Sequence, residues 1–144
     1  MKSFLIIFSI AISLNQMVFA QGEKSIKWLG IEEAQTLAKE NAKPIFVDFT
    51  AEWCGWCKKM DQTTFSDVKV AKVMNEGYYA VKLDFESKDK FEFKGKKITA
   101  KELAQRMEIS GLPTMIVLSS DLSSHQKIVG YKKSDDFLET LSKL

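Results

Sequence analysis

One segment of the chain reads Ile45-Phe46-Val47-Asp48-Phe49-Thr50-Ala51-Glu52-Trp53-Cys54-Gly55-Trp56-Cys57-Lys58. Its first five residues form a short apolar run of strand type that contains one carboxylate, and this run predicts a buried central strand. The strand leads directly into two cysteines three positions apart, after which Lys58 to Asp61 continues as a helix. The segment therefore predicts a cysteine pair at the junction of a strand and a helix.

This placement gives each cysteine a chemical role. Cys54 would lie at the helix N-terminus, where unpaired backbone N–H groups and the helix dipole favour its thiolate. Cys57 would lie about one helical turn later on the same face, close enough to attack a mixed disulfide formed by Cys54. We therefore expect Cys54 to be the nucleophile and Cys57 the resolving thiol.

Two other uses of the cysteine pair stay open as alternatives. A zinc site normally needs four ligands, but His125 is the only histidine and there is no second cysteine pair, so we expect no metal. A purely structural disulfide would constrain the unfolded chain little, because the loop it closes is so short. Redox chemistry is the reading that the spacing favours.

The first twenty residues differ in kind from the rest. Lys2 is their only charge, Phe4 to Leu14 form an apolar run, and Val18-Phe19-Ala20 fits a cleavage between Ala20 and Gln21. We predict a signal peptide at residues 1–20, with an uncleaved membrane anchor as the alternative. In either case the domain is expected to be exported, to the periplasm or beyond.

The remaining composition is that of one ordinary globular domain. The chain has 144 residues, of which 45% are hydrophobic and 28% charged, and no repeat or linker divides residues 21–144. Without Lys2, 20 basic residues face 19 acidic ones, a formal charge of +1. Such a balance argues against a nucleic-acid partner.

Hydrophobic spacing predicts further elements along the chain. Helices are expected over 31–41 and 67–74, from a capping box of Thr99 and Glu102 to Gly111, and after a cap at Ser134; strands are expected over 79–83, 115–118 and 127–129. Residues 85–97 fit either a small hairpin or a flexible excursion. An early parallel unit followed by an antiparallel pair implies an α/β sandwich, with helices on both faces of a mixed sheet.

The segment from Val47 to Lys58 resembles the active-site segment of the thioredoxin family, and Gly111-Leu112-Pro113-Thr114 resembles its cis-proline loop. The resemblance covers roughly residues 26–144 and implies the thioredoxin fold. Thr64-Phe65-Ser66-Asp67 and Val129-Gly130-Tyr131 are similar to the periplasmic branch, which includes the C-terminal thioredoxin domain of the bacterial membrane disulfide reductase. The Cys-Gly-Trp-Cys motif recurs in this branch, whose substrates differ.

The resemblance also implies roles for residues around the cysteines. Asp48 matches the carboxylate that accepts the proton of the resolving cysteine, and burial would raise its pKa in keeping with that role. Lys82 matches the lysine that can pair with this carboxylate. The alternatives are that Asp48 is a solvated residue at a strand end and that Lys82 points to solvent.

A substrate-binding surface is implied by the same comparison. Its residues would be Trp53, Gly55, Trp56, Leu112 and Pro113, with a cis bond before the proline and the Leu112 backbone free to pair with a bound peptide. Exposed tryptophans beside a nucleophile would suit docking of an extended polypeptide. Ordinary packing against the domain is the alternative for both rings.

The direction of the reaction depends on the residue between the cysteines. Trp56 stands where reducing thioredoxins typically have proline and strong oxidants have histidine. Since no histidine stabilises the Cys54 thiolate, we expect a monomeric reductase of disulfides in exported proteins, with no cofactor beyond its own cysteine pair and with electrons from a membrane-bound donor. A dithiol oxidase or isomerase, and a non-catalytic binding module, are the alternative functions.

Overall fold

The computed structural model describes residues 23–144, so the predicted signal peptide at residues 1–20 lies outside the described residues. Twelve helices and strands follow one another along these described residues. They are β1 (Trp28–Leu29), α1 (Ile31–Glu40), β2 (Ile45–Thr50), α2 (Gly55–Gln62), α3 (Val68–Gly77), β3 (Tyr79–Asp84), β4 (Phe91–Phe93), β5 (Lys96–Ile98), α4 (Ala100–Arg106), β6 (Thr114–Leu118), β7 (His125–Val129) and α5 (Ser134–Leu141).

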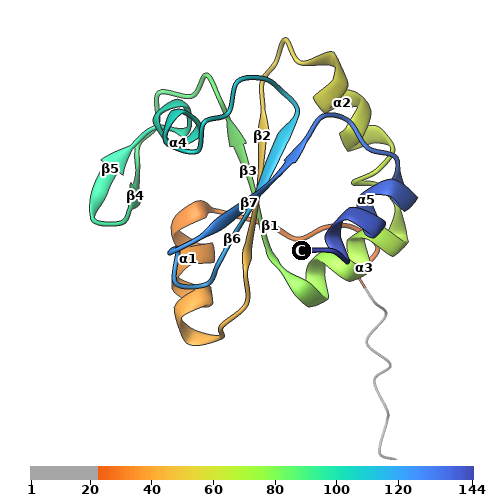
Figure 1. Ribbon diagram of the computed structural model, residues 1–144, viewed down its shortest axis with the longest axis horizontal. Coiled ribbons are helices and arrows are strands. Elements are labelled where there is room, and N and C mark those ends of the chain that lie inside the picture. Colours follow the sequence, from red (N-terminus) through yellow and green to blue (C-terminus); the bar gives the residue numbers. More distant parts are fainter. Residues whose placement is uncertain (1–22) are drawn as a thin grey trace, which may run out of the picture.

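Strand β2 is the centre of a five-stranded mixed sheet with the order β1-β3-β2-β6-β7. It runs parallel to β3 and antiparallel to β6, and β6 and β7 form the antiparallel pair that the sequence predicts. Helices α1 and α4 lie on one side of the sheet and α2, α3 and α5 on the other (Figure 1). The predicted α/β sandwich is therefore confirmed, and its topology is that of the thioredoxin fold.

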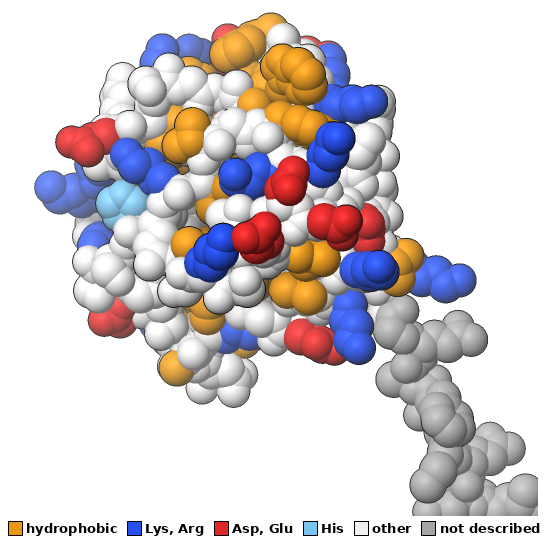
Figure 2. All heavy atoms as spheres, turned by 45° about the vertical axis from the view of Figure 1, so that its right-hand side comes forward, with side chains coloured by type: hydrophobic (Ala, Val, Ile, Leu, Met, Phe, Trp, Pro, Cys, Tyr) orange, Lys and Arg blue, Asp and Glu red, His pale blue; other side chains and the backbone are white. Residues whose placement is uncertain are grey.

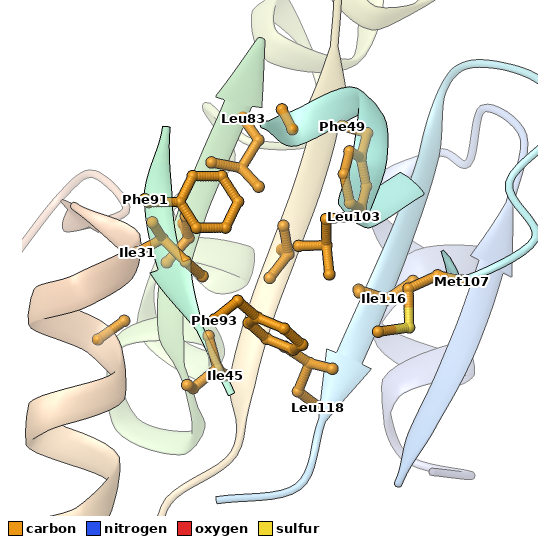
Figure 3. Close-up of a cluster of buried hydrophobic side chains, with 14 of the residues drawn as sticks. Ile31, Ile45, Phe49, Leu83, Phe91, Phe93, Leu103, Met107, Ile116 and Leu118 are labelled. Atoms are coloured by element: carbon orange, nitrogen blue, oxygen red, sulfur yellow. The ribbon is translucent and has the colours of Figure 1, made fainter. Parts of the chain in front are cut away.

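The two faces of the sheet bury two separate cores. Alternate residues of β2, Ile45, Val47 and Phe49, point into the core beneath α1 and α4 (Figure 3). Phe46 points the other way, where Phe65 and Phe137 meet its ring edge-on. The alternation follows from the period of two in a strand, and it places Asp48 on the same side as Phe46.

Residues 85–97, for which the sequence leaves two readings, end in a hairpin. Strands β4 and β5 pair in antiparallel fashion, and Phe91 and Phe93 bury their rings in the core under α1 (Figure 3). Side chains of α1 also hold β4: the Glu92 N–H donates to Glu32 Oε1, and Gln35 Nε2 donates to the Glu92 carbonyl, both at 2.8 Å. These contacts fix the hairpin on the apolar face.

Two predicted helix limits are wrong, although the capping box of Thr99 and Glu102 is confirmed. Helix α4 ends at Arg106, well before Gly111, because Glu108 adopts a left-handed φ of 54° that cannot continue the helix. The cap of α5 is Lys133 and not Ser134, since the Lys133 carbonyl accepts the first helical hydrogen bond, from Phe137 N–H at 2.9 Å.

Strand β1 is an element that the sequence does not predict. It has two residues, Trp28 and Leu29, which pair in parallel with Ala80 and Val81 of β3. Two residues are too few to show a period of two, so only the neighbouring strand reveals them. The strand matters for the site because it brings the Trp28 ring to the face of the sheet that carries Asp48.

Candidate active site

The two cysteines lie where β2 gives way to α2, and they form a disulfide with an S–S distance of 2.04 Å. Cys54 is the N-cap of α2, and its sulfur accepts a hydrogen bond from the Cys57 N–H at 3.1 Å. Such a bond favours negative charge on Cys54 once the disulfide is reduced. The predicted proximity of the two sulfurs is confirmed, and the arrangement can exchange two electrons with another thiol pair.

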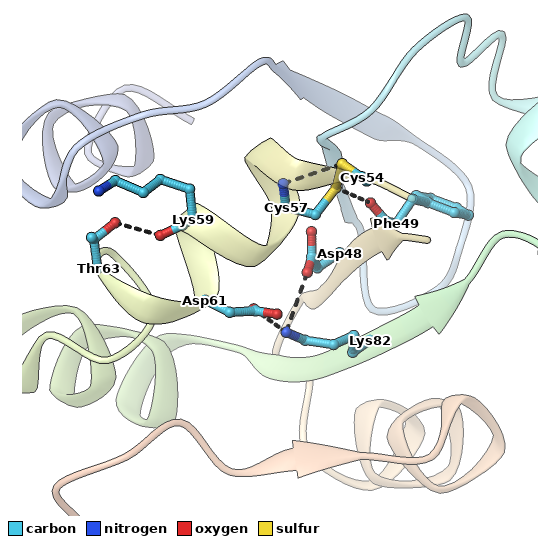
Figure 4. Close-up of polar contacts among 8 residues, drawn as sticks. All are labelled: Asp48, Phe49, Cys54, Cys57, Lys59, Asp61, Thr63 and Lys82. Atoms are coloured by element: carbon cyan, nitrogen blue, oxygen red, sulfur yellow. Dashed lines mark hydrogen bonds and ion pairs between the residues drawn. A yellow bond between two sulfur atoms is a disulfide. The ribbon is translucent and has the colours of Figure 1, made fainter. Parts of the chain in front are cut away.

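The disulfide is nearly covered by its surroundings. Cys54 is 4% exposed and Cys57 3%, and Ala51, Phe85 and Leu112 pack around them. The Cys57 sulfur lies 4.0 Å from the Phe49 carbonyl oxygen (Figure 4). A partner can therefore reach the sulfurs only by lying closely against this end of the sheet.

Asp48 lies under the disulfide in the middle of β2, with only 2% of its surface exposed. Burial raises the pKa of its carboxyl from 3.8 to about 7, while the nearby Lys82 ammonium lowers this pKa and the Asp61 carboxylate raises it further. The alternative of a solvated residue at a strand end is wrong. The carboxyl can gain or lose a proton near neutral pH, as a proton acceptor must.

Lys82 lies beside Asp48 on the neighbouring strand, in direct register with it. Its Nζ is 3.6 Å from Asp48 Oδ2, and it also forms a hydrogen-bonded ion pair with Asp61 of α2. Figure 4 shows the Asp48 side chain between the disulfide and Lys82. Lys82 thus reaches the carboxylate that the resemblance implies, and the alternative of a lysine pointing to solvent is wrong.

Asp61 is the residue of this cluster that the sequence analysis missed. A signal for it exists, because Asp61 follows Cys57 by four residues and such residues share one face of a helix. What the sequence lacked was the position of the facing strand. Only when β3 is placed beside β2 does Asp61 meet Lys82.

Both tryptophans of the motif are exposed: Trp53, which precedes Cys54, by 63%, and Trp56, which lies between the cysteines, by 62%. One side of the Trp56 ring rests on Tyr131, with ring centroids 5.3 Å apart, whereas ordinary packing does not account for Trp53. Figure 2 shows hydrophobic side chains gathered at the end of the molecule where α2 lies, with positively charged side chains beside them. An extended polypeptide could lie on this surface.

The other predicted substrate contacts surround the same opening. Gly55 is the first residue of α2 and has open space where a side chain would be. Leu112 packs against the cysteines, and its peptide bond to Pro113 is cis. The Pro113 carbonyl is already used, since it accepts a hydrogen bond from the Gly130 N–H at 2.9 Å. The structure therefore places Gly55, Leu112 and Pro113 around the end of the sheet where the disulfide lies, and Asp48 and Lys82 deeper along the strands.

No group of three or more His, Cys, Asp or Glu side chains within residues 23–144 is arranged to hold a metal ion. In the same part of the chain, none of the helices is both long and apolar enough to span a bilayer.

Comparison with known proteins gives consistent matches. A family model described as a thioredoxin-like domain matches residues 31–144. The thiol:disulfide interchange protein DsbD of Campylobacter jejuni (strain RM1221) is 32% identical over an alignment of 131 residues, which covers 89% of this chain and 21% of that protein. The chain thus spans about a fifth of the length of this curated relative.

Two solved structures with the same fold are those of a DsbH protein and of a DsbD domain. The structure titled DsbH oxidoreductase has a TM-score of 0.71 and 19% identity, covering 90% of both chains. The oxidised C-terminal domain of DsbD from Neisseria meningitidis has a TM-score of 0.61 and 24% identity, covering 78% of this chain and 90% of that one. At these identities the likeness supports the fold.

Proposed function

The chain belongs to the thioredoxin-like domain family, and from this premise we propose that it is a thiol-disulfide oxidoreductase that reduces disulfides in exported proteins. One observation carries the proposal: a cysteine disulfide at the start of α2 lies directly above a buried carboxyl whose pKa is about 7. The thioredoxin-like domain is proposed to extend over residues 21–144 and to act as a monomer.

The first step uses Cys54. In the reduced protein its thiolate attacks one sulfur of the substrate disulfide, so that a bond forms between Cys54 and the substrate while the substrate's own S–S bond breaks. The second substrate sulfur leaves as a thiolate and takes a proton from water. The helix N-terminus and the Cys57 N–H stabilise the attacking thiolate.

The second step releases the substrate. The Cys57 thiol gives its proton to the Asp48 carboxylate, and the resulting thiolate attacks the Cys54 sulfur. The bond between Cys54 and the substrate breaks, the remaining substrate sulfur leaves as a thiolate and is protonated, and the Cys54–Cys57 disulfide forms. The substrate has gained two electrons, and a dithiol donor must return two to the protein.

The exposed end of the site supplies the substrate contacts. We assign the apolar contacts to Trp53, Trp56 and Leu112, the open approach to Gly55, and the shape of the groove wall to Pro113. The 62% exposure of a Trp56 ring already supported by Tyr131 favours this role, because a ring held in place loses little freedom when a peptide covers it.

The direction and setting of the reaction rest on the sequence. No histidine lies between the cysteines, so one source of a strongly oxidising pair is missing. Residues 1–20 have the pattern of an export signal, and an exported domain needs a membrane-bound donor for its electrons. A periplasmic or secreted reductase follows from these two points.

Cysteine variants test the activity. Cys54→Ser should abolish reduction of a protein disulfide, whereas Cys57→Ser should accumulate a mixed disulfide with the substrate that mass spectrometry detects. Lys59→Ala, at an exposed position of α2, serves as the matched control and should keep normal turnover. Retained substrate affinity in Cys54→Ser, together with no turnover in the unaltered protein, would instead identify a binding module.

The reduction potential of the cysteine pair tests the direction. We expect a value near about −270 mV, the range of thioredoxin, by equilibration with glutathione buffers and counting of alkylated thiols. A value near about −120 mV would reverse the physiological direction to dithiol oxidation. Efficient reshuffling of a scrambled substrate without net reduction would indicate an isomerase.

A further inference from the structure

The Lys82 ammonium is enclosed by more than its two carboxylate partners. It lies 4.6 Å from the centre of the Trp28 ring and 5.5 Å from the centre of the Phe65 ring. The two rings meet edge-on with their centroids 5.4 Å apart, so each ring holds the other in place. A cation over two aromatic faces is attracted by both, and the attraction grows as water is removed.

The side chains that build this enclosure come from two distant parts of the chain. Trp28 belongs to β1, Phe65 follows α2, and Asp61 lies in the last turn of α2. Lys82 forms its hydrogen-bonded ion pair with Asp61, whereas its 3.6 Å separation from Asp48 exceeds a normal hydrogen bond. The ammonium is thus held closer to the half-exposed carboxylate than to the buried one.

We propose that Asp61, together with the Trp28 ring, positions the Lys82 ammonium at ion-pair distance from the Asp48 carboxyl but beyond normal hydrogen-bond length, and so sets the pH range in which Asp48 accepts the Cys57 proton. Asp61 and Trp28 are positioning residues, since neither touches the reacting sulfurs. The inference rests on the proposed role of Asp48 as proton acceptor.

The physical reason is competition for one cation. If Lys82 bound Asp48 alone, the ion pair would stabilise the charged carboxylate, which would then hold a proton poorly near neutral pH. Sharing Lys82 with Asp61 weakens this effect, and the Asp61 charge itself favours the protonated form of Asp48. The carboxyl stays able to take a proton and to give it up.

The titratable and charged groups around Asp48 within residues 23–144 are few. Lys82 faces it from β3, and Asp61 and Cys57 face it from α2 (Figure 4). Its register partner on β6, Met115, is uncharged and buried. A change in the titration of Asp48 can therefore be traced to very few side chains.

Carboxyl-carbon NMR titration of Asp48 in the reduced protein tests the proposal without requiring turnover. Asp61→Asn should lower the titration midpoint of Asp48 by about one pH unit, because Lys82 then pairs fully with Asp48. Lys82→Met should raise the midpoint by a similar amount. Lys43→Met removes another lysine that lies over an aromatic ring, Tyr79 at 4.4 Å, and should leave the midpoint unchanged.

The double variant Asp61→Asn with Lys82→Met separates positioning from bare charge. If Asp61 acts through Lys82, Asp61→Asn should shift the midpoint less than half as far in the Lys82→Met background as in the unaltered protein. An equal shift in both backgrounds, or no shift in either, would overturn the proposal. Trp28→Leu should also lower the titration midpoint of Asp48. An unchanged midpoint in that variant would show that Trp28 does not help to position Lys82.

The same NMR data distinguish this proposal from the proposed function. An Asp48 midpoint that moves as expected, with turnover insensitive to pH over the same range, would uphold the positioning of Lys82 and reject Asp48 as the proton acceptor. An Asp48 midpoint that is the same in all the variants, with turnover that follows the titration of Asp48, would reject the positioning of Lys82 and uphold Asp48 as the proton acceptor.

Discussion

Both faces of the central strand are buried, yet only one carries charge. Ile45, Val47 and Phe49 enter a core of apolar side chains beneath α1, α4 and the hairpin. On the opposite face, Phe46 has Asp48 as its neighbour, and the carboxyl lies close to Lys82. The difference teaches that one strand can serve stability on one side and proton transfer on the other, because its side chains alternate.

The charged face also has the elements that make a buried carboxyl tolerable. Helix α2 brings both Cys57 and Asp61 over β2, and β3 brings Lys82 in register with Asp48. Nothing of this kind is needed on the apolar face, where close packing alone determines stability. The comparison predicts that truncating a buried ring on the apolar face and neutralising Asp48 on the charged face change the free energy of unfolding in opposite directions.

The largest expected loss of stability is on the apolar face. Phe93→Ala should lower the free energy of unfolding by about 3–5 kcal/mol, because it leaves a cavity in a fully packed core. Urea denaturation measures the change, and Val129→Ala, at a position 67% exposed, is the control with an expected change below about 0.5 kcal/mol. A reduction potential that differs between Phe93→Ala and the unaltered protein would show that the apolar face also affects the cysteine chemistry, against the division of roles between the two faces.

On the charged face, Asp48→Asn should stabilise the protein. Because folding raises the pKa of Asp48 from 3.8 to about 7, its contribution to stability is full below pH 3.8 and is lost as pH rises to 7. The variant avoids this loss, so above pH 7 its free energy of unfolding should be higher by roughly 4 kcal/mol at most. Substrate release should slow in the same variant, because the proton acceptor is missing.

The check is the difference in unfolding free energy between Asp48→Asn and the unaltered protein, measured from pH 3 to pH 9. The difference should rise through the window from 3.8 to 7 and then stay level. A difference that does not change with pH would mean that folding does not raise the pKa of Asp48. Subtraction removes the opposite contributions of carboxyls with lowered pKa values, such as Asp121.

A smaller effect is expected at the cap of α4, which covers the apolar face. Thr99→Ala should cost about 1 kcal/mol, because the Glu102 N–H loses its side-chain acceptor. Thr99→Ser keeps the hydroxyl and should restore most of the stability in thermal unfolding. Equal losses in both variants would show that the methyl group, and not the cap, is responsible.

The smallest effect on stability is expected at the exposed end of the charged face. Trp56→Ala should change the unfolding free energy by less than about 0.5 kcal/mol but raise KM for a protein disulfide several-fold. Reduction of glutathione disulfide, which is too small to cover the ring, should keep its KM. A rise in KM for both substrates would indicate that Trp56 acts on the sulfurs and not on docking.

Much of the fold was predictable because local pattern and final position agree. The apolar run at 45–49, the capping box at Thr99 and Glu102, and the strands near 115–118 and 127–129 are all present. The C-terminal end of α4 and the start of α5 were predicted wrongly, since Gly111 is a good helix terminator and Ser134 a good N-cap by residue type. The backbone at Glu108 and Lys133 sets the real limits. Local preference is weaker than packing at such positions.

By itself, the sequence determined the cysteine spacing, the single carboxylate in an apolar strand and the alternation that gives β2 two different faces. These properties depend on residues close in the chain. Tertiary structure alone decided that Lys82 is shared between Asp48 and Asp61 and lies over Trp28 and Phe65. Those contacts join β1, β2, α2 and β3, and no local preference specifies how segments so far apart come together.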